Sequence, residues 1–317
     1  MDIKNILALS MIKGIGPAFI KRNINRIASD TNCYALVEEY KAEQIENVAV
    51  CLEKADKIIK DCALYGIEII SIISPNYPNS LKEINDPPCV LFAKGNKRLL
   101  NKCIAIIGTR KSTNLGNKIA EKIGNYFSKD YAICNGLVEG IDEHSIYING
   151  RILPNVIGII SGGLCYEETC SKVHIKVIND VLHAGGLVIT EFFPHAKEDK
   201  FSGSKASRIQ AGLSQGLILV QSSIDGGSKY TIASFAKLGR AMAVVHYPSS
   251  KEYQDNSFSG NRIIVEEKYE GIAKMINFKT VSKLNIKSIT ILERKEDYTS
   301  FIRRMAGCDQ VLDLGLL

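Results

Sequence analysis

The sequence predicts an α/β protein with a Rossmann-like, doubly wound and mostly parallel sheet that follows a small helical domain. Short apolar runs recur between residues 67 and 280, and most of them lead into a glycine-containing turn and then a helical pattern. That alternation favours a parallel sheet. The first 66 residues instead carry apolar side chains at helical spacing. Hydrophobic residues make up 45% of the chain and charged residues 23%, which is ordinary for a globular protein.

Length and composition limit the possible classes of protein. The 317 residues can form one large domain with one or two small ones. No apolar run approaches the roughly 18 residues of a membrane span, and the N-terminus lacks a signal-peptide core. The nine cysteines are scattered and lie mostly in apolar runs, so we expect buried free thiols and a cytoplasmic protein. The formal charge of +6 permits a nucleic-acid partner without requiring one.

Residues 1–66 are predicted to form the helical domain, of helix-hairpin-helix or SAM-like type. The stretch I-K-G-I-G-P, residues 12–17, lies between two helical patterns. Its exposed amides could contact a phosphate backbone without reading sequence. A plain turn between helices, using glycine for a positive φ, fits equally well. A further helix over residues 49–65 should end at Gly66.

The stretch around which the chain is organised is residues 104–116, I-A-I-I-G-T-R-K-S-T-N-L-G. Four apolar residues, 104–107, are typical of a buried parallel strand. Gly108 allows a sharp turn, and Ser112 and Thr113 are suitable N-cap residues for the next helix. A strand, a glycine turn and a capped helix together predict an anion site, where free amides and the positive helix end face a phosphate.

Arg110 and Lys111 lie inside that turn and add positive charge. Gly108 and Gly116 alone complete neither the dinucleotide fingerprint nor a Walker A loop. A plain strand-to-helix turn with a solvated Arg-Lys pair therefore stays open as an alternative.

Further strands are predicted within residues 131–142, 156–164, 186–191, 217–229 and 241–264, most of them leading into a glycine turn. Ligands bind outside the carboxyl ends of the strands in such sheets. The turns should therefore form one polar groove at one edge. This requires Gly108, Gly136, Gly162 and Gly227 on the same side of the molecule, and an accessible Arg110.

Three segments carry a family resemblance: Y-P-N-S-L at residues 77–81, D-P-P-C-V-L-F-A-K-G-N at 86–96 and A-I-I-G-T-R-K at 105–111. In this order they resemble the DprA (Smf) family of DNA-processing proteins, over roughly residues 67–275. The resemblance implies a Rossmann-like domain at 67–280 that binds single-stranded DNA and protects incoming strands. It also implies a RecA-type recombinase and a second copy of the chain as partners, with no catalytic residues, cofactor, metal or membrane contact.

The same resemblance implies the binding residues. Arg110 matches the arginine of the family's G-T-R turn, Arg208 matches the arginine of a later helix, and Asn261 matches a late asparagine. The full expected set for DNA or phosphate is Gly108, Thr109, Arg110, Lys111, Ser112, Gly136, Gly140, Asp142, Gly162, Gly163, Lys205, Arg208, Gly227, Ser228, Lys229, Thr231 and Asn261.

Several positions depart from the family pattern, which makes the chain a divergent member. Ala206-Ser207 replaces an Arg-Asn pair, and Gln221 stands at an acidic position. Two alternative functions therefore remain: a sensor of a nucleotide ligand on the same scaffold, and, less favoured, a nucleotide hydrolase using Asp142 and Glu191. The P-G-G-x-G-T-x-x-E element of the related phosphoribohydrolases is absent.

Side chains around the expected groove suggest how DNA would be held. Phe201, Tyr230 and Phe258 are candidates for stacking on bases, with core or loop packing as the alternative. Basic residues near the glycine loops are Arg110, Lys111, Lys118, Lys200, Lys205, Arg208, Lys229, Arg240 and Arg262.

Cys165, Cys170 and His174 have a spacing loosely like that of a metal site. Only three ligands are present and the linker is not a zinc knuckle, so we expect buried thiols and a surface histidine instead.

The segment 281–317 is predicted to be a short extension, too short for the winged helix that many family members carry. Residues 288–292 suggest an edge strand and residues 298–305 a helix. The apolar ending at residues 311–317 should pack on another surface, such as a second subunit.

Overall fold

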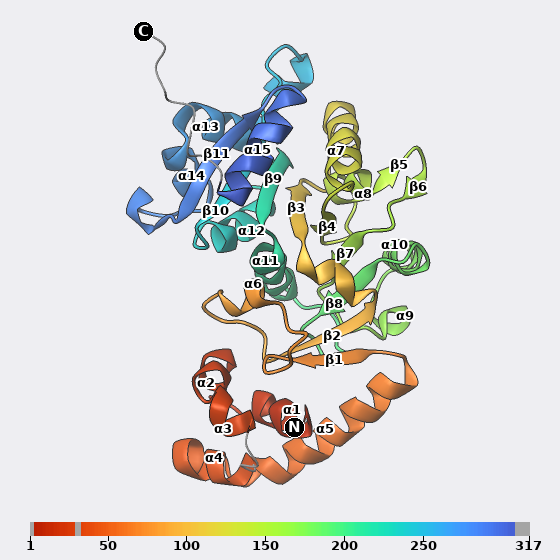
Figure 1. Ribbon diagram of the computed structural model, residues 1–317, viewed down its shortest axis with the longest axis vertical. Helices are drawn as coiled ribbons and strands as arrows, with labels where there is room; N and C mark the ends of the chain where they lie inside the picture. Colours follow the sequence, from red (N-terminus) through yellow and green to blue (C-terminus); the bar gives the residue numbers. More distant parts are fainter. Residues whose placement is uncertain (1–2, 29–32, 308–317) are drawn as a thin grey trace.

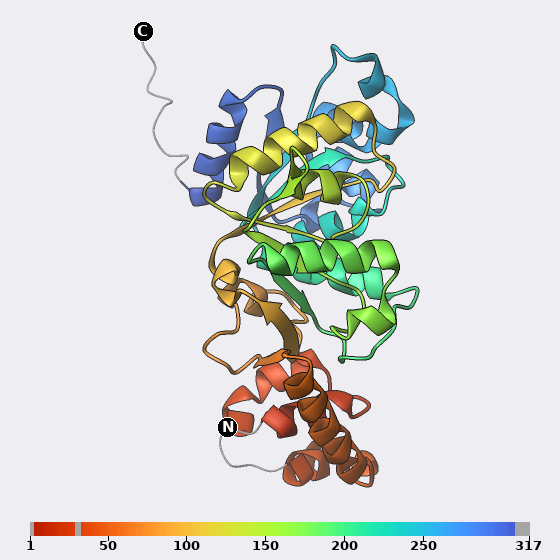
Figure 2. The same ribbon diagram turned by 90° about the vertical axis from the view of Figure 1, so that its right-hand side faces the viewer.

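The computed structural model describes residues 3–28 and 33–307. The molecule is elongated, and the N-terminal helices form one end of it in both views (Figures 1 and 2). No helix in the described part is long and apolar enough to cross a bilayer. Residues 311–317, expected to pack on another surface, lie outside the described residues.

A nine-stranded sheet forms the centre, in the order β1-β2-β8-β7-β4-β3-β9-β10-β11. Within it β2 runs antiparallel to both of its neighbours, and the remaining pairs are parallel. The strands are β1 (Glu68–Ser71), β2 (Val90–Gly95), β3 (Cys103–Gly108), β4 (Ala132–Asn135), β7 (Val156–Ile159), β8 (Leu187–Thr190), β9 (Gly216–Gln221), β10 (Arg240–Val245) and β11 (Ile286–Leu292). The predicted mostly parallel sheet is confirmed.

Alternate residues of β3 face two different cores. Ile104 and Ile106 belong to one hydrophobic cluster, whereas Ala105 and Ile107 belong to the other. Side chains of a strand alternate between the faces of its sheet, so the sheet is covered on both faces, as the apolar runs predicted. Figure 2 shows α7 (yellow) and α10 (green) covering one of these faces.

The helices of this domain are α6 (Asn79–Lys82), α7 (Asn114–Phe127), α8 (Ile141–Ile146), α9 (Tyr166–Thr169), α10 (Lys172–His183), α11 (Ser202–Leu213), α12 (Ser228–Phe235), α13 (Ser259–Glu267), α14 (Tyr269–Met275) and α15 (Glu296–Ala306). A small hairpin, β5 (Tyr147–Ile148) and β6 (Arg151–Ile152), follows α8.

Strand order reverses direction beside β3. Strands β3, β4, β7 and β8 extend the sheet to one side, and β9, β10 and β11 then extend it to the other. Such a reversal leaves a crevice at the carboxyl ends of the two central strands, because the connections leave the sheet in opposite directions.

The N-terminal helices are α1 (Ile3–Met11), α2 (Pro17–Arg22), α3 (Ile24–Ala28), α4 (Cys33–Lys41) and α5 (Asn47–Leu64). Gly14, in the turn between α1 and α2, has a φ of +87°, and Gly66, just after α5, has a φ of +63°. Buried side chains of α1 belong to the same hydrophobic cluster as those of β1 and β2. The helical unit thus packs against the end of the sheet farthest from β11.

Beyond residue 280 the chain returns to the sheet. The expected strand begins at Ile286 and pairs in parallel with β10, so this segment supplies the outermost strand. The following helix, α15, buries Phe301 completely. The segment expected to be an extension therefore completes one side of the sheet.

Candidate functional site

A cleft of about 740 Å³ opens where the strand order reverses. Its walls come from the loop after β3, the loop after β4, the end of β7, the first turns of α11 and the first turn of α12. Nine of the expected site residues line it: Gly108, Thr109, Arg110, Lys111, Gly136, Asp142, Gly227, Ser228 and Thr231.

The glycine turns therefore share one side of the molecule. Gly162 does not line the cleft itself, but its neighbour Ser161 does. Arg110 is exposed, and it has no hydrogen bond or ion pair to any other described residue. The two conditions set by the sequence, one common groove and an accessible Arg110, thus agree with the structure.

Eight expected residues lie outside the cleft lining: Ser112, Gly140, Gly162, Gly163, Lys205, Arg208, Lys229 and Asn261. Two of these are glycines that close packing requires. A Cβ on Gly140, whose φ is +82°, would lie 2.4 Å from the Thr109 carbonyl oxygen. A Cβ on Gly163 would lie 2.1 Å from the Phe193 carbonyl oxygen. A side chain at either position would collide with the backbone of a neighbouring loop, so both positions require glycine.

Asn261, expected to contact the ligand, is fully buried. Its Nδ2 donates to the carbonyl oxygens of Val220 and Val245, at 3.0 and 3.1 Å, and its Oδ1 accepts from the Ser222 amide at 2.9 Å. The residue joins the ends of β9 and β10 beneath the surface. Its assignment to the DNA site is wrong, because its side chain is already saturated by backbone groups.

Arg208, the other expected arginine, is held by two carboxylates. Its Nε donates to Asp86 at 2.8 Å and its Nη2 donates to Glu191 at 2.7 Å. Burial raises the pKa of Glu191, and the charge of Arg208 opposes that rise. Arg208 therefore neutralises the largely buried Glu191 and the exposed Asp86, and it does not line the cleft.

The amides at the start of α7 are also engaged. Thr113 caps the helix as expected and accepts from the Gly116 amide at 3.1 Å. Gln221 Oε1 accepts from the Thr113 amide, and Glu252 accepts from the Leu115 amide, both at 3.0 Å. The expectation that free amides of this helix end face a phosphate is wrong. The amides of Thr113, Leu115 and Gly116 are thus not available to a ligand, whereas the positive side chains that line the cleft are.

The charges that line the cleft are mainly positive. Arg110, Lys111 and Lys200 are the basic lining residues, and Asp142 is the acidic one. Asp142 accepts from the Gly136 amide at 2.8 Å, which holds the loop after β4 in place. Burial raises the pKa of Asp142 to about 7, against the effect of the amides of Gly136 and Val138. Near neutral pH the carboxyl group is therefore partly protonated, which lowers its repulsion of an anion.

Two aromatic rings stand at the cleft. Phe201 is 58% exposed and Tyr230 is 53% exposed, and both line it. Lys200 Nζ lies 4.9 Å from the centre of the Phe201 ring, and Lys229 Nζ lies 5.8 Å from that of Tyr230. Each aromatic ring is thus paired with a cation. Phe258, the third candidate, is fully buried against Tyr253, so it cannot stack on a ligand.

Two further basic residues stabilise the fold through hydrogen bonds to backbone carbonyl groups. Arg240 donates to the carbonyl oxygens of Gly212 and Ser214, each at 2.8 Å. Arg262 donates to the carbonyl oxygen of Asp255 at 2.8 Å. A guanidinium in such surroundings needs acceptors for its five N–H groups, and backbone carbonyls supply them.

The structure separates the two carboxylates of the hydrolase alternative. Asp142 lines the cleft, whereas Glu191 lies outside the lining and pairs with Arg208. General acid–base hydrolysis needs two groups that reach the same substrate atoms. The proposed pair does not meet this requirement.

Small residues of α11 form a wall that the sequence did not assign to the site. Gly203, Ser204, Ala206 and Ser207 all line the cleft. Their spacing places them on one helical face, and this is the signal that could have been used. Ala206 and Ser207 stand where the family pattern has an Arg-Asn pair. In this chain the wall therefore consists of small, uncharged side chains.

These features define a Rossmann-like α/β protein with a basic, aromatic-bearing cleft at the point where the strand order reverses. The family model described as DNA recombination-mediator protein A matches residues 68–281. The chain belongs to this family, which confirms the predicted resemblance to DprA and Smf proteins.

The most informative relatives are bacterial DNA-processing proteins. The chain is 31% identical to DNA processing protein DprA of Bacillus subtilis over 212 residues, which cover 66% of this chain and 70% of the relative. It is 31% identical to the Streptococcus pneumoniae protein of the same name over 173 residues, which cover 54% of this chain and 60% of the relative.

Solved structures show the same fold. The X-ray structure of DNA processing protein A from S. pneumoniae superposes with a TM-score of 0.72 at 21% identity, covering 95% of this chain and 98% of that one. A structure of DNA processing protein A from Helicobacter pylori superposes with a TM-score of 0.55 at 23% identity, covering 63% and 87%.

Proposed function

We propose that this protein binds single-stranded DNA in the cleft, as a DNA-processing protein that carries out no catalysis. The observation that supports this most directly is the exposed Arg110, which lines the cleft together with the exposed rings of Phe201 and Tyr230. The structure from H. pylori concerns the single-stranded DNA binding mode of a protein with the same fold.

The geometry suggests how a strand would lie. Phosphates would face Arg110, Lys111 and Lys200, because these side chains carry the positive charge of the cleft. They would lie away from Asp142, whose ionised carboxylate repels a phosphate. Bases would stack on Phe201 and Tyr230, a contact that every base can make through its π-face. Binding of this kind depends strongly on salt and only weakly on base sequence.

Protection of incoming DNA, transfer of the strand to a RecA-type recombinase and assembly as a homodimer complete the proposal. They rest on membership of the family, and each is tested with the purified chain. Strand transfer predicts that the chain speeds recombinase loading onto oligonucleotides coated with single-stranded-DNA-binding protein. A dimer predicts twice the chain mass in light scattering.

The deciding experiment measures binding of labelled oligo-dT by fluorescence anisotropy at several salt concentrations. We expect salt-sensitive binding by the wild type. Arg110→Ala should weaken it at least about tenfold and reduce the magnitude of the salt slope by about 0.7, the value for one lost phosphate contact. Arg151→Ala is the matched control, because Arg151 is exposed on β6 and does not line the cleft. Equal effects of the two variants would contradict the proposal.

A nucleotide sensor remains the second candidate, and the size of the cleft supports it. About 740 Å³ falls within the roughly 300–1,000 Å³ typical of small-molecule sites. If the wild type fails to bind oligo-dT but shows a thermal shift with a mononucleotide that Arg110→Ala removes, the sensor replaces the DNA-binding proposal.

A further inference from the structure

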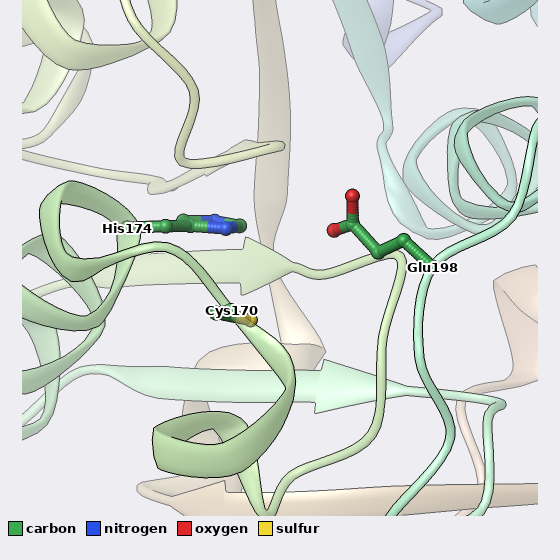
Figure 3. Close-up of side chains that lie close together, drawn as sticks. All are labelled: Cys170, His174 and Glu198. Atoms are coloured by element: carbon green, nitrogen blue, oxygen red, sulfur yellow. The ribbon is translucent and has the colours of Figure 1, made fainter.

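Cys170, His174 and Glu198 approach one another beside the cleft. One potential ligand atom from each residue lies within 4.8 Å of those of the other two. Figure 3 shows the imidazole, the thiol and the carboxylate turned toward a common space, from α10, the end of α9 and the loop before α11. Cys165, which shares the metal-like spacing in the sequence, is not part of this cluster, and its Sγ lies 3.7 Å from His195 Nε2.

One ring nitrogen of the histidine in this cluster lacks a hydrogen-bond partner. His174 Nε2 is buried and makes no hydrogen bond to any described residue. His174 is therefore not the surface histidine that the sequence suggested. An unsatisfied buried polar atom is destabilising, and a bound ion would remove that cost.

The three side chains have the chemistry of a zinc site. Thiolate, imidazole and carboxylate are the protein ligands that Zn²⁺ prefers, at about 2.3 Å for sulfur and about 2.0–2.2 Å for nitrogen and oxygen. Tetrahedral ligand atoms at those distances lie roughly 3.3–3.7 Å apart. The three ligand atoms already lie within 4.8 Å of one another, so small side-chain adjustments, helped by the exposure of Glu198, would bring them to coordination distance.

We propose that Cys170, His174 and Glu198 bind one Zn²⁺ ion at the edge of the cleft, with a fourth position open to solvent or to a phosphate oxygen. Formation of the Zn–S bond releases the thiol proton of Cys170 to solvent. Ser161 connects the site to the cleft: it lines the cleft, and its Oγ donates to Glu198 Oε1 at 3.1 Å. The ion would fix the loop before α11 against α10, next to the basic residues.

Zinc content provides the direct test. Tag-free protein is stripped with a chelator, exposed to Zn²⁺, freed of excess metal and analysed by mass spectrometry for zinc per chain. We expect one zinc per wild-type chain. Cys170→Ser and His174→Ala should each weaken binding at least about tenfold in competition with a coloured chelator. Cys165→Ser is the matched control, a buried cysteine outside the cluster, and should retain the zinc.

Cobalt substitution tests the same site independently of stability. Co²⁺ bound by the thiolate should give a sulfur-to-metal charge-transfer band in the wild type and in Cys165→Ser, and none in Cys170→Ser. Since Cys170→Ser is nearly isosteric, it remains informative if His174→Ala fails to fold. A wild type that holds no more zinc than Cys170→Ser, or that lacks the cobalt band, would overturn the proposal. These measurements use no DNA, so their failure leaves the proposed DNA binding unaffected.

Discussion

At the scale of single residues, the surroundings of each guanidinium decide what it does. Arg208, Arg240 and Arg262 are surrounded by carboxylates or carbonyl oxygens, so their charge is used within the fold. Arg110 has no such acceptor among the described residues and extends into the cleft. A buried guanidinium is stabilised by acceptors for its N–H groups, whereas one beside an open cleft leaves its N–H groups accessible.

The two exposed aromatic rings supply a prediction about base stacking. Phe201→Ala and Tyr230→Ala should each weaken oligo-dT binding by about 1–3 kcal/mol, because each removes one stacking surface. Fluorescence anisotropy at fixed salt measures the loss. Tyr247→Ala is the control, since Tyr247 is 41% exposed but does not line the cleft. Unchanged affinity in both cleft variants would exclude stacking on these rings.

Asp142 predicts a pH dependence of DNA binding. Burial raises its pKa to about 7, so the side chain is neutral below that pH and negative above it. The negative form repels phosphates, and affinity should therefore fall as the pH rises from about 6 to about 8. Asp142→Asn keeps an oxygen that can accept from the Gly136 amide and should show a flatter profile. If both proteins give the same profile at constant ionic strength, Asp142 is not the responsible group.

At the scale of elements, the start of α7 is tied to β9 through Gln221. The side chain accepts from the Thr113 amide at 3.0 Å and donates to Ser257 Oγ at 2.7 Å. The helix packs so closely here that a Cβ on Gly116 would lie 2.0 Å from Gln221 Oε1. Gly116 thus serves the contact between a helix and a strand, rather than the backbone conformation of a phosphate loop.

This contact predicts coupling between two substitutions. Gly116→Ala alone should destabilise the protein, because its methyl group collides with Gln221. In a Gln221→Ala background the methyl group finds vacated space, and the higher helix propensity of alanine recovers up to about 1 kcal/mol. Urea unfolding of the four proteins in the cycle should give a coupling on the order of 1–3 kcal/mol. Additive effects would show that the two side chains do not compete for the same space.

At the scale of the whole molecule, Arg240 joins segments that are distant in sequence. It begins β10 and donates to carbonyl oxygens at the end of α11, to the Ser80 carbonyl oxygen at 2.9 Å and to Glu83 at 2.7 Å. The proline-containing segment before β2 is thereby held against the opposite half of the sheet domain. Arg240 thus links two segments that are far apart in the sequence, a contact that no local sequence pattern predicts.

Arg240→Lys should therefore destabilise the whole sheet domain. A single ammonium group cannot reach acceptors on both segments, so we expect a loss on the order of 2–4 kcal/mol in the free energy of unfolding. Circular dichroism during urea unfolding measures this value. Arg294→Lys is the matched control, because Arg294 is highly exposed and its nearest carboxylate contact, to Asp297, is 3.9 Å. A loss no larger than that of the control would contradict a bridging role for Arg240.

Much of this protein could be predicted from local sequence patterns. The apolar run at residues 104–107, the Thr113 cap and the glycine after α5 all depend on interactions within a few residues, and the structure contains each of them. The order of motifs between residues 77 and 111 also led to the correct family, because the motifs are contiguous in the chain.

Tertiary structure alone decided which of the expected site residues face the cleft. Asn261 and Arg208 carry the right chemistry, but partners more than a dozen residues away in the sequence use their polar atoms. The small wall of α11 and the approach of Glu198 to Cys170 and His174 likewise depend on how distant loops meet at one edge of the sheet. A sequence reports which donors and acceptors a chain holds, whereas their pairing is set by packing across the fold.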